Sequence, residues 1–167
     1  MPSYLTLAGF QTESLDKTKF TKDAAEYLGL GIRVDRATGD LPASTTGAIF
    51  TVSGGPVLLT FILGSVTTVI QTQACNYSLE SDPTVAGSNV ALCAVLDISA
   101  KAVGTYFTIT GTLATAMSSG LAVIGQNTKL VVPAGSIVQK TSATNTGQVA
   151  WSMWYQPLVA GASVAAA

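Results

Sequence analysis

The segment QVAWSMWYQ, residues 148–156, alternates between large apolar residues and mostly polar or small ones. Successive side chains of an extended strand point to opposite faces, so this period of two predicts a strand with one buried face. The face expected to be buried carries Val149, Trp151, Met153 and Tyr155, and the other face carries Gln148, Ala150, Ser152, Trp154 and Gln156. We therefore predict a half-buried β-strand over Gln148–Tyr155.

The chain before this segment has the composition of further strands. Stretches rich in Val, Ile, Thr and aromatic residues alternate with turn-forming sequences such as SGGP, GQNT and ATNTG. The other predicted strands are Ala48–Val52, Val57–Val66, Thr68–Leu79, Asn89–Ser99, Thr105–Thr110, Leu121–Ile124, Lys129–Val132 and Ser136–Thr141. No helical pattern longer than two turns follows residue 45. The fold expected is therefore an all-β antiparallel sandwich or barrel, resembling a jelly roll.

Charge divides the 167-residue chain into two regions. Eleven of its 17 charged residues lie in residues 1–40. We predict a charged N-terminal arm and connector at residues 1–45, and a β-sandwich body with a C-terminal tail at residues 46–167. The arm contains one predicted short helix over residues 21–29, with Thr21 as its N-cap and Gly29 at its C-terminal end. Residues 29–47 are interpreted as an extended, turn-rich connector.

Several functional classes are disfavoured by the composition. The net charge of −1 provides no cationic patch for nucleic acid, and the absence of histidine removes the commonest catalytic base and zinc ligand. We therefore expect no nucleic-acid partner, no cofactor, no metal and no enzymatic activity. The most apolar stretch, residues 56–70, is shorter than the roughly 18 apolar residues of a membrane helix, so no membrane partner is expected.

The cysteines and the acids of the body have plain interpretations. Cys75 and Cys93 are interpreted as small buried residues, although a disulfide between neighbouring strands is an alternative. Glu80 and Asp82 precede Pro83 among turn formers, which favours solvated loop acids. A glycoside hydrolase using Glu80, Asp82 or Asp97 is the least favoured hypothesis.

Aromatic and apolar residues at the two ends of the chain are the candidate interface residues. If Trp151 points into the core, strand alternation turns Trp154 outward, where it can anchor a partner. The alternative, in which the arm or a loop of the same subunit covers Trp154, is equally weighted. The arm is too apolar for a purely solvated tail. The candidate interface residues are Leu15, Phe20, Tyr27, Leu28, Ile32, Trp154, Tyr155, Pro157 and Leu158.

Residues 131–164, VVPAGSIVQKTSATNTGQVAWSMWYQPLVAGASV, carry two short motifs. They are Pro133-Ala134-Gly135-Ser136-Ile137, a turn that starts a strand, and Trp154-Tyr155-Gln156-Pro157-Leu158, an aromatic strand end followed by a Gly/Ala/Val tail. This stretch resembles the C-terminal part of small virion proteins of tailed bacteriophages. The resemblance implies a head decoration, or cement, protein: a β-rich, often trimeric protein that binds the outside of a capsid.

The resemblance sets the expected partners and location. The partners are the major capsid protein and other copies of the chain, with a homotrimer favoured, and the location is the capsid surface of a virion after synthesis in the host cytoplasm. The alternative is a carbohydrate- or receptor-binding β-sandwich of a tail fibre or cell surface, in which Trp154 stacks on a sugar ring.

Overall fold

Two antiparallel sheets form the protein in the computed structural model, which describes residues 31–85, 87–123 and 125–167. The first sheet has the order β1-β11-β3-β7-β8, with β9 paired to β3, and comprises Ile32–Asp40 (β1), Val57–Thr68 (β3), Tyr106–Thr108 (β7), Ser118–Gly120 (β8), Leu130–Val132 (β9) and Gln148–Pro157 (β11). The second has the order β12-β2-β10-β4-β5, with β6 paired to β4, and comprises Thr46–Ser53 (β2), Asn76–Pro83 (β4), Val90–Ala91 (β5), Leu96–Asp97 (β6), Gly135–Thr141 (β10) and Ser163–Ala166 (β12).

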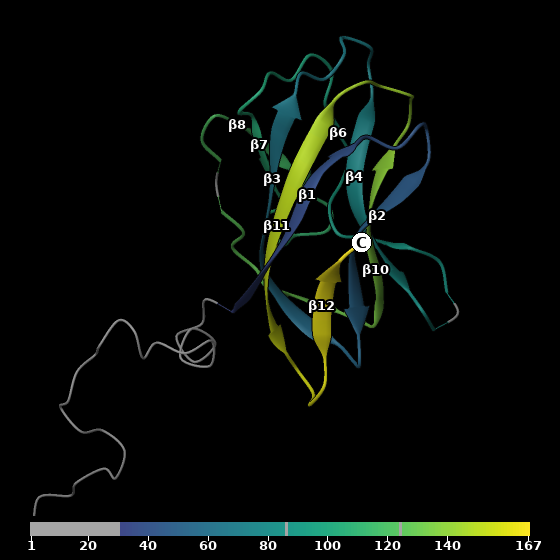
Figure 1. Cartoon of the computed structure of the whole chain (residues 1–167), viewed down its shortest axis with the longest axis vertical. Helices are drawn as coiled ribbons and strands as arrows, with labels where there is room; N and C mark the ends of the chain where they lie inside the picture. The colour runs from purple at the N-terminus through teal and green to yellow at the C-terminus, as the bar shows by residue number, and fades with distance from the viewer. Residues whose placement is uncertain (1–30, 86, 124) are drawn as a thin grey trace, which may run out of the picture.

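The strand order is that of a jelly roll. The chain alternates between the sheets as it passes through β1, β2, β3 and β4, and it returns through β10 in the second sheet and β11 in the first. The returning strands insert between the earlier ones, so β11 lies between β1 and β3 while β10 lies between β2 and β4. Figure 1 shows the first sheet on the left and the second on the right. The predicted all-β sandwich with a jelly-roll-like arrangement is therefore confirmed.

The core lies between the inner faces of the two sheets, and β11 supplies its largest side chain. Val149, Trp151, Met153 and Tyr155 are all buried, which confirms the alternation predicted for this strand. Trp151 stacks against Tyr77 of the opposite sheet with ring centroids 6.5 Å apart, and Tyr77 in turn contacts Phe107 at 6.0 Å. Aromatic contacts of this kind add to the free energy gained by burying the rings.

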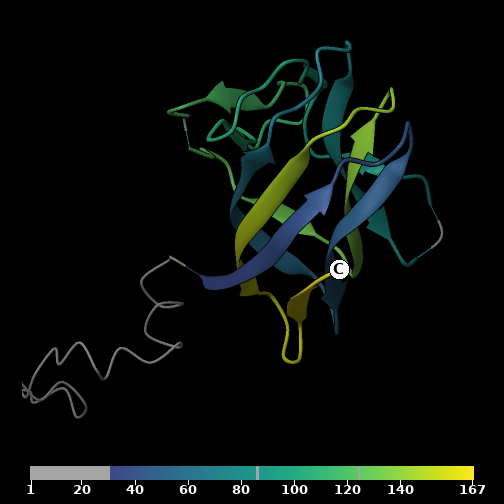
Figure 2. The same cartoon turned by 45° about the horizontal axis from the view of Figure 1, so that its top comes forward.

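The connector predicted for residues 29–47 is wrong for Ile32–Asp40, which form β1 and pair with β11. Ile32 and Val34 pack against the core, so burial on one face and pairing with a long central strand make this charged segment part of the sandwich. Figure 2 shows β1 running alongside β11. Gly31 fixes the start of the strand, because its φ of 76° favours glycine and a Cβ there would lie 2.6 Å from the carbonyl oxygen of Tyr155. The sandwich therefore begins within the range assigned to the arm; the helix predicted over residues 21–29 lies outside the described residues.

Three other strand predictions are wrong in extent. Within the stretch predicted as Thr68–Leu79, a new strand begins only at Asn76. The stretch Asn89–Ser99 contains only the two-residue strands β5 and β6. Residues 121–123, predicted as part of a strand over Leu121–Ile124, belong to no strand. The apolar residues that suggested these strands, among them Ile70, Cys75, Leu92 and Ile98, are buried from connecting segments instead. The predicted C-terminal tail ends in β12, which pairs with β2 on the edge of the second sheet.

Candidate functional site

Trp154 lies on the outer face of the first sheet, as predicted, and is half-buried by residues of the two neighbouring strands. Pairing aligns Arg33 of β1, Trp154 of β11 and Phe61 of β3 in one row across the sheet. The Phe61 ring is tilted by 47° to the indole with centroids 5.4 Å apart, and the Arg33 guanidinium carbon lies 5.1 Å over the indole. Among the described residues, the cover of Trp154 comes from neighbouring strands of the same sheet and includes a cation–π contact.

A β-bulge sets the direction of this row. Trp154 pairs with Phe61 and Tyr155 pairs with Leu59, so Thr60 is the extra residue on β3. The Thr60 hydroxyl donates a hydrogen bond to the carbonyl oxygen of Trp154 at 2.9 Å, which holds the bulge in place. Bulges twist a strand locally and change the direction of the side chains beside them.

A polar network borders the indole in the next row. Arg33 Nε donates to Asp35 Oδ1 at 2.8 Å, and the Ser152 hydroxyl donates to the same oxygen at 2.5 Å. The Ser152 hydrogen bond is the main cause of a lowered pKa of the Asp35 carboxyl; burial opposes it, and the contact with Arg33 adds to it. Arg33 and Asp35 are exposed, so the pair orders the Arg33 side chain over Trp154 more than it stabilises the fold.

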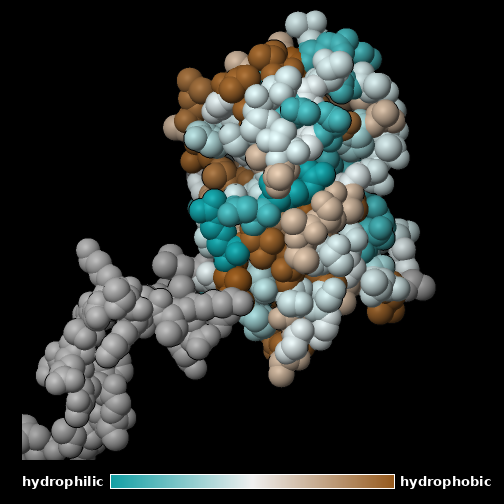
Figure 3. Space-filling view, in the orientation of Figure 1, coloured by the Kyte–Doolittle hydropathy of each residue, from teal (hydrophilic) through white to brown (hydrophobic). Residues whose placement is uncertain are grey.

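We name Arg33, Asp35, Phe61, Ser152 and Trp154 the aromatic surface. Leu58 and the exposed Val131 share the same outer face in the adjoining row. Further exposed apolar residues, including Leu113 and Leu121, lie towards β8, and Figure 3 shows hydrophobic residues gathered over the region of β7 and β8. The first sheet therefore presents aromatic and apolar groups beside a fixed cation and carboxylate.

The other predicted interface residues have different positions. The prediction of Tyr155 as an interface residue is wrong, because the alternation of β11 turns its side chain into the core, where only 4% of the residue is exposed. Ile32 packs against the core, and Pro157 ends β11 opposite Val57. Leu158 is exposed just beyond the strand. Leu15, Phe20, Tyr27 and Leu28 lie outside the described residues.

The sequence reading missed Arg33, Asp35 and Phe61 as parts of this surface. A signal for the first two was present, because Ile32-Arg33-Val34-Asp35 alternates with the period of a half-buried strand. Phe61 had no such signal, since Val57–Val66 reads as a continuous apolar run and the bulge at Thr60 shifts its phase.

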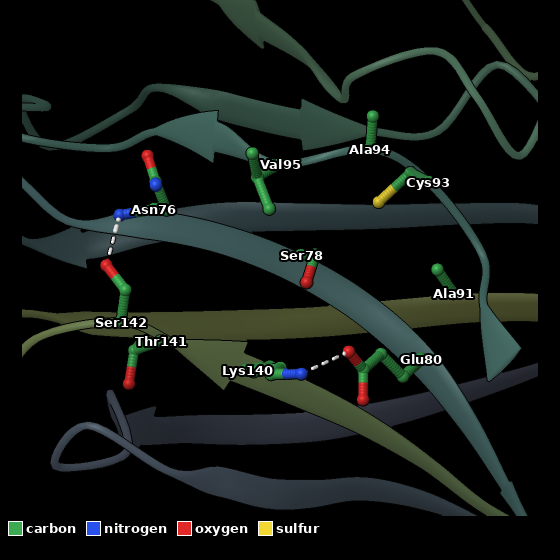
Figure 4. A pocket seen from close by; sticks show the side chains of 10 residues that line it. All are labelled: Asn76, Ser78, Glu80, Ala91, Cys93, Ala94, Val95, Lys140, Thr141 and Ser142. Carbon is green, nitrogen blue, oxygen red and sulfur yellow. Dashed lines mark hydrogen bonds and ion pairs between the residues drawn. The ribbon is translucent and has the colours of Figure 1, made fainter. Parts of the chain in front are cut away.

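A groove lies on the outer face of the second sheet (Figure 4). It has a volume of 320 Å³ and is lined by Asn76, Ser78, Glu80, Ala91, Cys93, Ala94, Val95, Lys140, Thr141 and Ser142. The prediction that Glu80 is a solvated loop acid is wrong: it lies in β4, only 8% of it is exposed, and Lys140 Nζ is 2.9 Å from its Oε1. Cys93, Ala94 and Val95, which follow β5, line the groove together with Glu80. Lys140 and Asn89 bind its two carboxylate oxygens, which explains why a charged residue can be buried there.

Asp97 and the cysteines have structural contacts. Asp97 accepts hydrogen bonds from the main-chain N–H groups of Ser99 and Cys75, and these bonds lower its pKa. Both cysteines are free and buried, as the favoured interpretation has it. Cys93 Sγ accepts a hydrogen bond from the N–H of Leu79 at 3.4 Å, and burial raises the pKa of the thiol.

The described residues contain neither a metal-binding cluster nor a membrane-spanning helix, and the chain matches no family model. Within residues 31–85, 87–123 and 125–167 there is no group of three or more His, Cys, Asp or Glu residues placed to hold a metal ion. The same residues include no helix with the length and apolarity needed to cross a bilayer. A scan against protein-family models, a search of curated proteins and a search of solved structures each found no match.

Proposed function

We propose that the chain is a structural protein of a virus particle, a decoration protein that binds the capsid of a tailed bacteriophage as a homotrimer. The observation that carries the proposal is the aromatic surface. Tryptophan and arginine are the residue types that most often dominate the free energy of protein–protein contacts, and here they are ordered before a partner arrives. The resemblance of residues 131–164 to phage virion proteins supports the same class.

The first described strand begins at the edge of this surface, where Ile32 pairs with Tyr155 and Arg33 pairs with Trp154. The second part of the proposal is that the apolar residues of the preceding segment contact the same partner as Trp154. Contacts from both regions would add through multivalency on a repeating capsid lattice.

The position of Arg33 favours a protein partner over a sugar. A sugar ring that stacks on an indole needs a free ring face, and the guanidinium of Arg33 lies over the ring of Trp154. Displacing it would break its contacts with Asp35 and Ser152. A protein partner can instead pack on the assembled Arg33–Trp154 unit. Jelly rolls occur in both capsid proteins and lectins, so the fold itself does not separate the two hypotheses.

Light scattering of the full chain over a wide concentration range tests the oligomeric part of the proposal. We expect a trimer for the wild type and a monomer, or a much weaker trimer, for Trp154→Ala. Val103→Ala is the matched control, because Val103 is also an exposed apolar residue but lies in a different segment. A wild-type monomer, or equal mass for all three proteins, contradicts the assignment of Trp154 to the subunit interface.

Capsid binding tests the role in the particle. Undecorated capsids of the phage that encodes the chain are mixed with the full chain or with a chain lacking residues 1–30, and bound protein is measured by co-sedimentation. The truncation ends before β1, so the sandwich keeps all its strands. We expect saturable binding of the full chain and clearly weaker binding of the truncated chain. No binding by the full chain refutes the decoration role.

The carbohydrate- or receptor-binding module is the second candidate, favoured by the carboxylate and hydroxyl beside the indole. A glycan array compares the wild type with Trp154→Ala and with Arg33→Ala, which uncovers the ring. Sugar binding by the wild type that is lost in Trp154→Ala would support this function, and no binding by the wild type or Arg33→Ala excludes it for the glycans sampled.

A further inference from the structure

Three side chains from separate segments meet at the edge of the groove in the second sheet. Lys140 Nζ of β10 lies 2.9 Å from Oε1 of Glu80, and Asn89 Nδ2 donates a hydrogen bond to Oε2 of the same carboxylate at 3.1 Å. Glu80 lies on β4 and only 10% of its side chain is exposed. One buried carboxylate therefore holds an amine with one oxygen and a primary amide with the other.

We propose that Lys140 and Asn89 become joined by an intramolecular isopeptide bond, with Glu80 transferring the protons. The Lys140 amine nitrogen attacks Cγ of Asn89, the new bond is Nζ–Cγ, and the Cγ–Nδ2 bond breaks. Because the pair begins as an ammonium group and a carboxylate, the products are a secondary amide between the two side chains and one ammonium ion, which carries both protons released by Nζ. No oxidant, reductant or other reactant takes part, and Glu80 ends in the protonation state in which it began.

The hydrogen bonds set out the path of the protons. A proton passing from Nζ to Oε1 along the 2.9 Å contact converts the ion pair into a neutral amine, which is nucleophilic, and a carboxylic acid. Oε2 already contacts Nδ2, the nitrogen that must leave, so the carboxyl group can deliver a proton to it. Holding both reacting groups on one carboxylate also replaces an encounter in solution with a pre-arranged contact.

The surroundings of Glu80 limit the access of water from one side. Ala91, Ala94 and Val95 form an apolar wall of the groove. The Lys140 side chain is 53% exposed, so water reaches the ammonium group from the other side. We therefore expect the reaction to be slow compared with folding, and to proceed only in the folded chain, which brings the three segments together.

The bond would tie the segment between β4 and β5 to β10, across the strand that carries Glu80. β5 pairs with β4 over only two residues at the edge of the sheet. A covalent bond beside it would therefore add to the few main-chain hydrogen bonds that hold this segment. The inference rests on the Lys140–Glu80–Asn89 geometry alone and does not depend on the proposed role in a virus particle.

Intact-mass spectrometry of the full chain tests the proposal, with samples taken from purification through prolonged incubation below the unfolding temperature. We expect the wild type to lose the mass of one ammonia molecule. Digestion should then yield a branched peptide that links Lys140 to Asn89. Lys140→Arg keeps a cation beside Glu80 but should not lose ammonia, and Glu80→Gln should react far more slowly. Circular dichroism checks that each variant is folded.

The outcomes decide the matter in either direction. A wild-type mass that stays equal to that of the unmodified chain throughout the incubation overturns the proposal. Loss of ammonia that persists in Lys140→Arg, or that gives no branched peptide, shows that another residue reacted and also overturns it. A cross-link that forms at an unchanged rate in folded Glu80→Gln refutes the role of Glu80. Should Glu80→Gln fail to fold, Lys140→Arg and Asn89→Ala still test the bond.

Discussion

Replacing Gly64 with alanine tests the packing at the centre of the sandwich. Gly64 of β3 pairs with Trp151 of β11, and the indole of Trp151 lies over the space where a side chain would be. A Cβ at Gly64 would meet Cη2, Cζ3 and Cζ2 of that indole at 2.8, 2.9 and 3.0 Å. Trp151 is only 1% exposed and stacks on Tyr77, so the ring cannot move away freely.

Two opposing effects set the magnitude. An extra methyl group in a strand would ordinarily stabilise the fold by about 0.5–1 kcal/mol, because glycine loses more conformational freedom on folding. Here the contacts must lengthen by about 0.5–1 Å to reach an ordinary carbon–carbon separation. Overpacking of this kind costs about 1–3 kcal/mol, and three close atoms favour the upper part of that range. We expect Gly64→Ala to lower the free energy of unfolding by about 1–2 kcal/mol.

Urea unfolding followed by tryptophan fluorescence gives the measurement. Gly87→Ala is the matched control, because a Cβ at Gly87 would meet only the carbonyl oxygen of Val85, at 3.7 Å. We expect that control to change stability by less than about 0.5 kcal/mol. Adding Trp151→Phe, which shortens the ring, should remove most of the cost of Gly64→Ala. If Gly64→Ala is neutral or stabilising, or costs the same beside Phe, the indole does not pack against Gly64 as described.

Three further predictions concern hydrogen bonds and titration. Cys93→Ala leaves the buried main-chain N–H of Leu79 without its acceptor. Chemical denaturation should therefore show a loss in the free energy of unfolding that is about 1–3 kcal/mol larger for Cys93→Ala than for Cys75→Ala. Equal losses would contradict the Cys93 hydrogen bond. Burial raises the pKa of Tyr77 far above its usual value, so the unfolded chain releases this proton first as pH rises. The free energy of unfolding should therefore fall above about pH 10, by up to about 1.4 kcal/mol per pH unit, and Tyr77→Phe should flatten that slope in pH-dependent denaturation. Ser152→Ala removes the largest cause of the lowered pKa of Asp35, so NMR titration should show the pKa of that carboxyl moving up, and no movement would refute the Ser152 hydrogen bond.

The sequence predicted the strands whose pattern is local. In β11 the alternation of Trp151 and Met153 with Ser152 and Trp154 is visible in the sequence, and both the strand and its buried face are confirmed. β12 has no such pattern. Val164 is its only buried residue, and the strand exists because β2 offers an unpaired edge more than 100 residues earlier in the chain. Pairings of this kind are set by the assembled sheets and leave little trace in the segment itself.

Both candidate sites depend on such distant pairings. The aromatic surface joins Arg33, Phe61 and Trp154 only because β11 inserts between β1 and β3. The Glu80 site likewise needs β10 at one edge of β4 and, at the other edge, the segment around Asn89 that leads into β5. Sequence reasoning could identify Trp154 as an outward aromatic residue, but it placed Glu80 in a loop, because two polar residues followed by proline are typical of a turn.

The two sites lie on the outer faces of different sheets, and this separation makes their functions independent. The aromatic surface is built on β1, β11 and β3, whereas the Glu80 site uses β4, β10 and the segment before β5. A covalent tie in the second sheet leaves the row of Arg33, Trp154 and Phe61 unchanged, since no strand contributes to both. We therefore expect Lys140→Arg to keep the wild-type mass in light scattering, and Trp154→Ala to lose ammonia at the wild-type rate. If either substitution changed the other readout, the two outer faces would be coupled through the core, and the assignment of separate roles to the two sheets would be wrong.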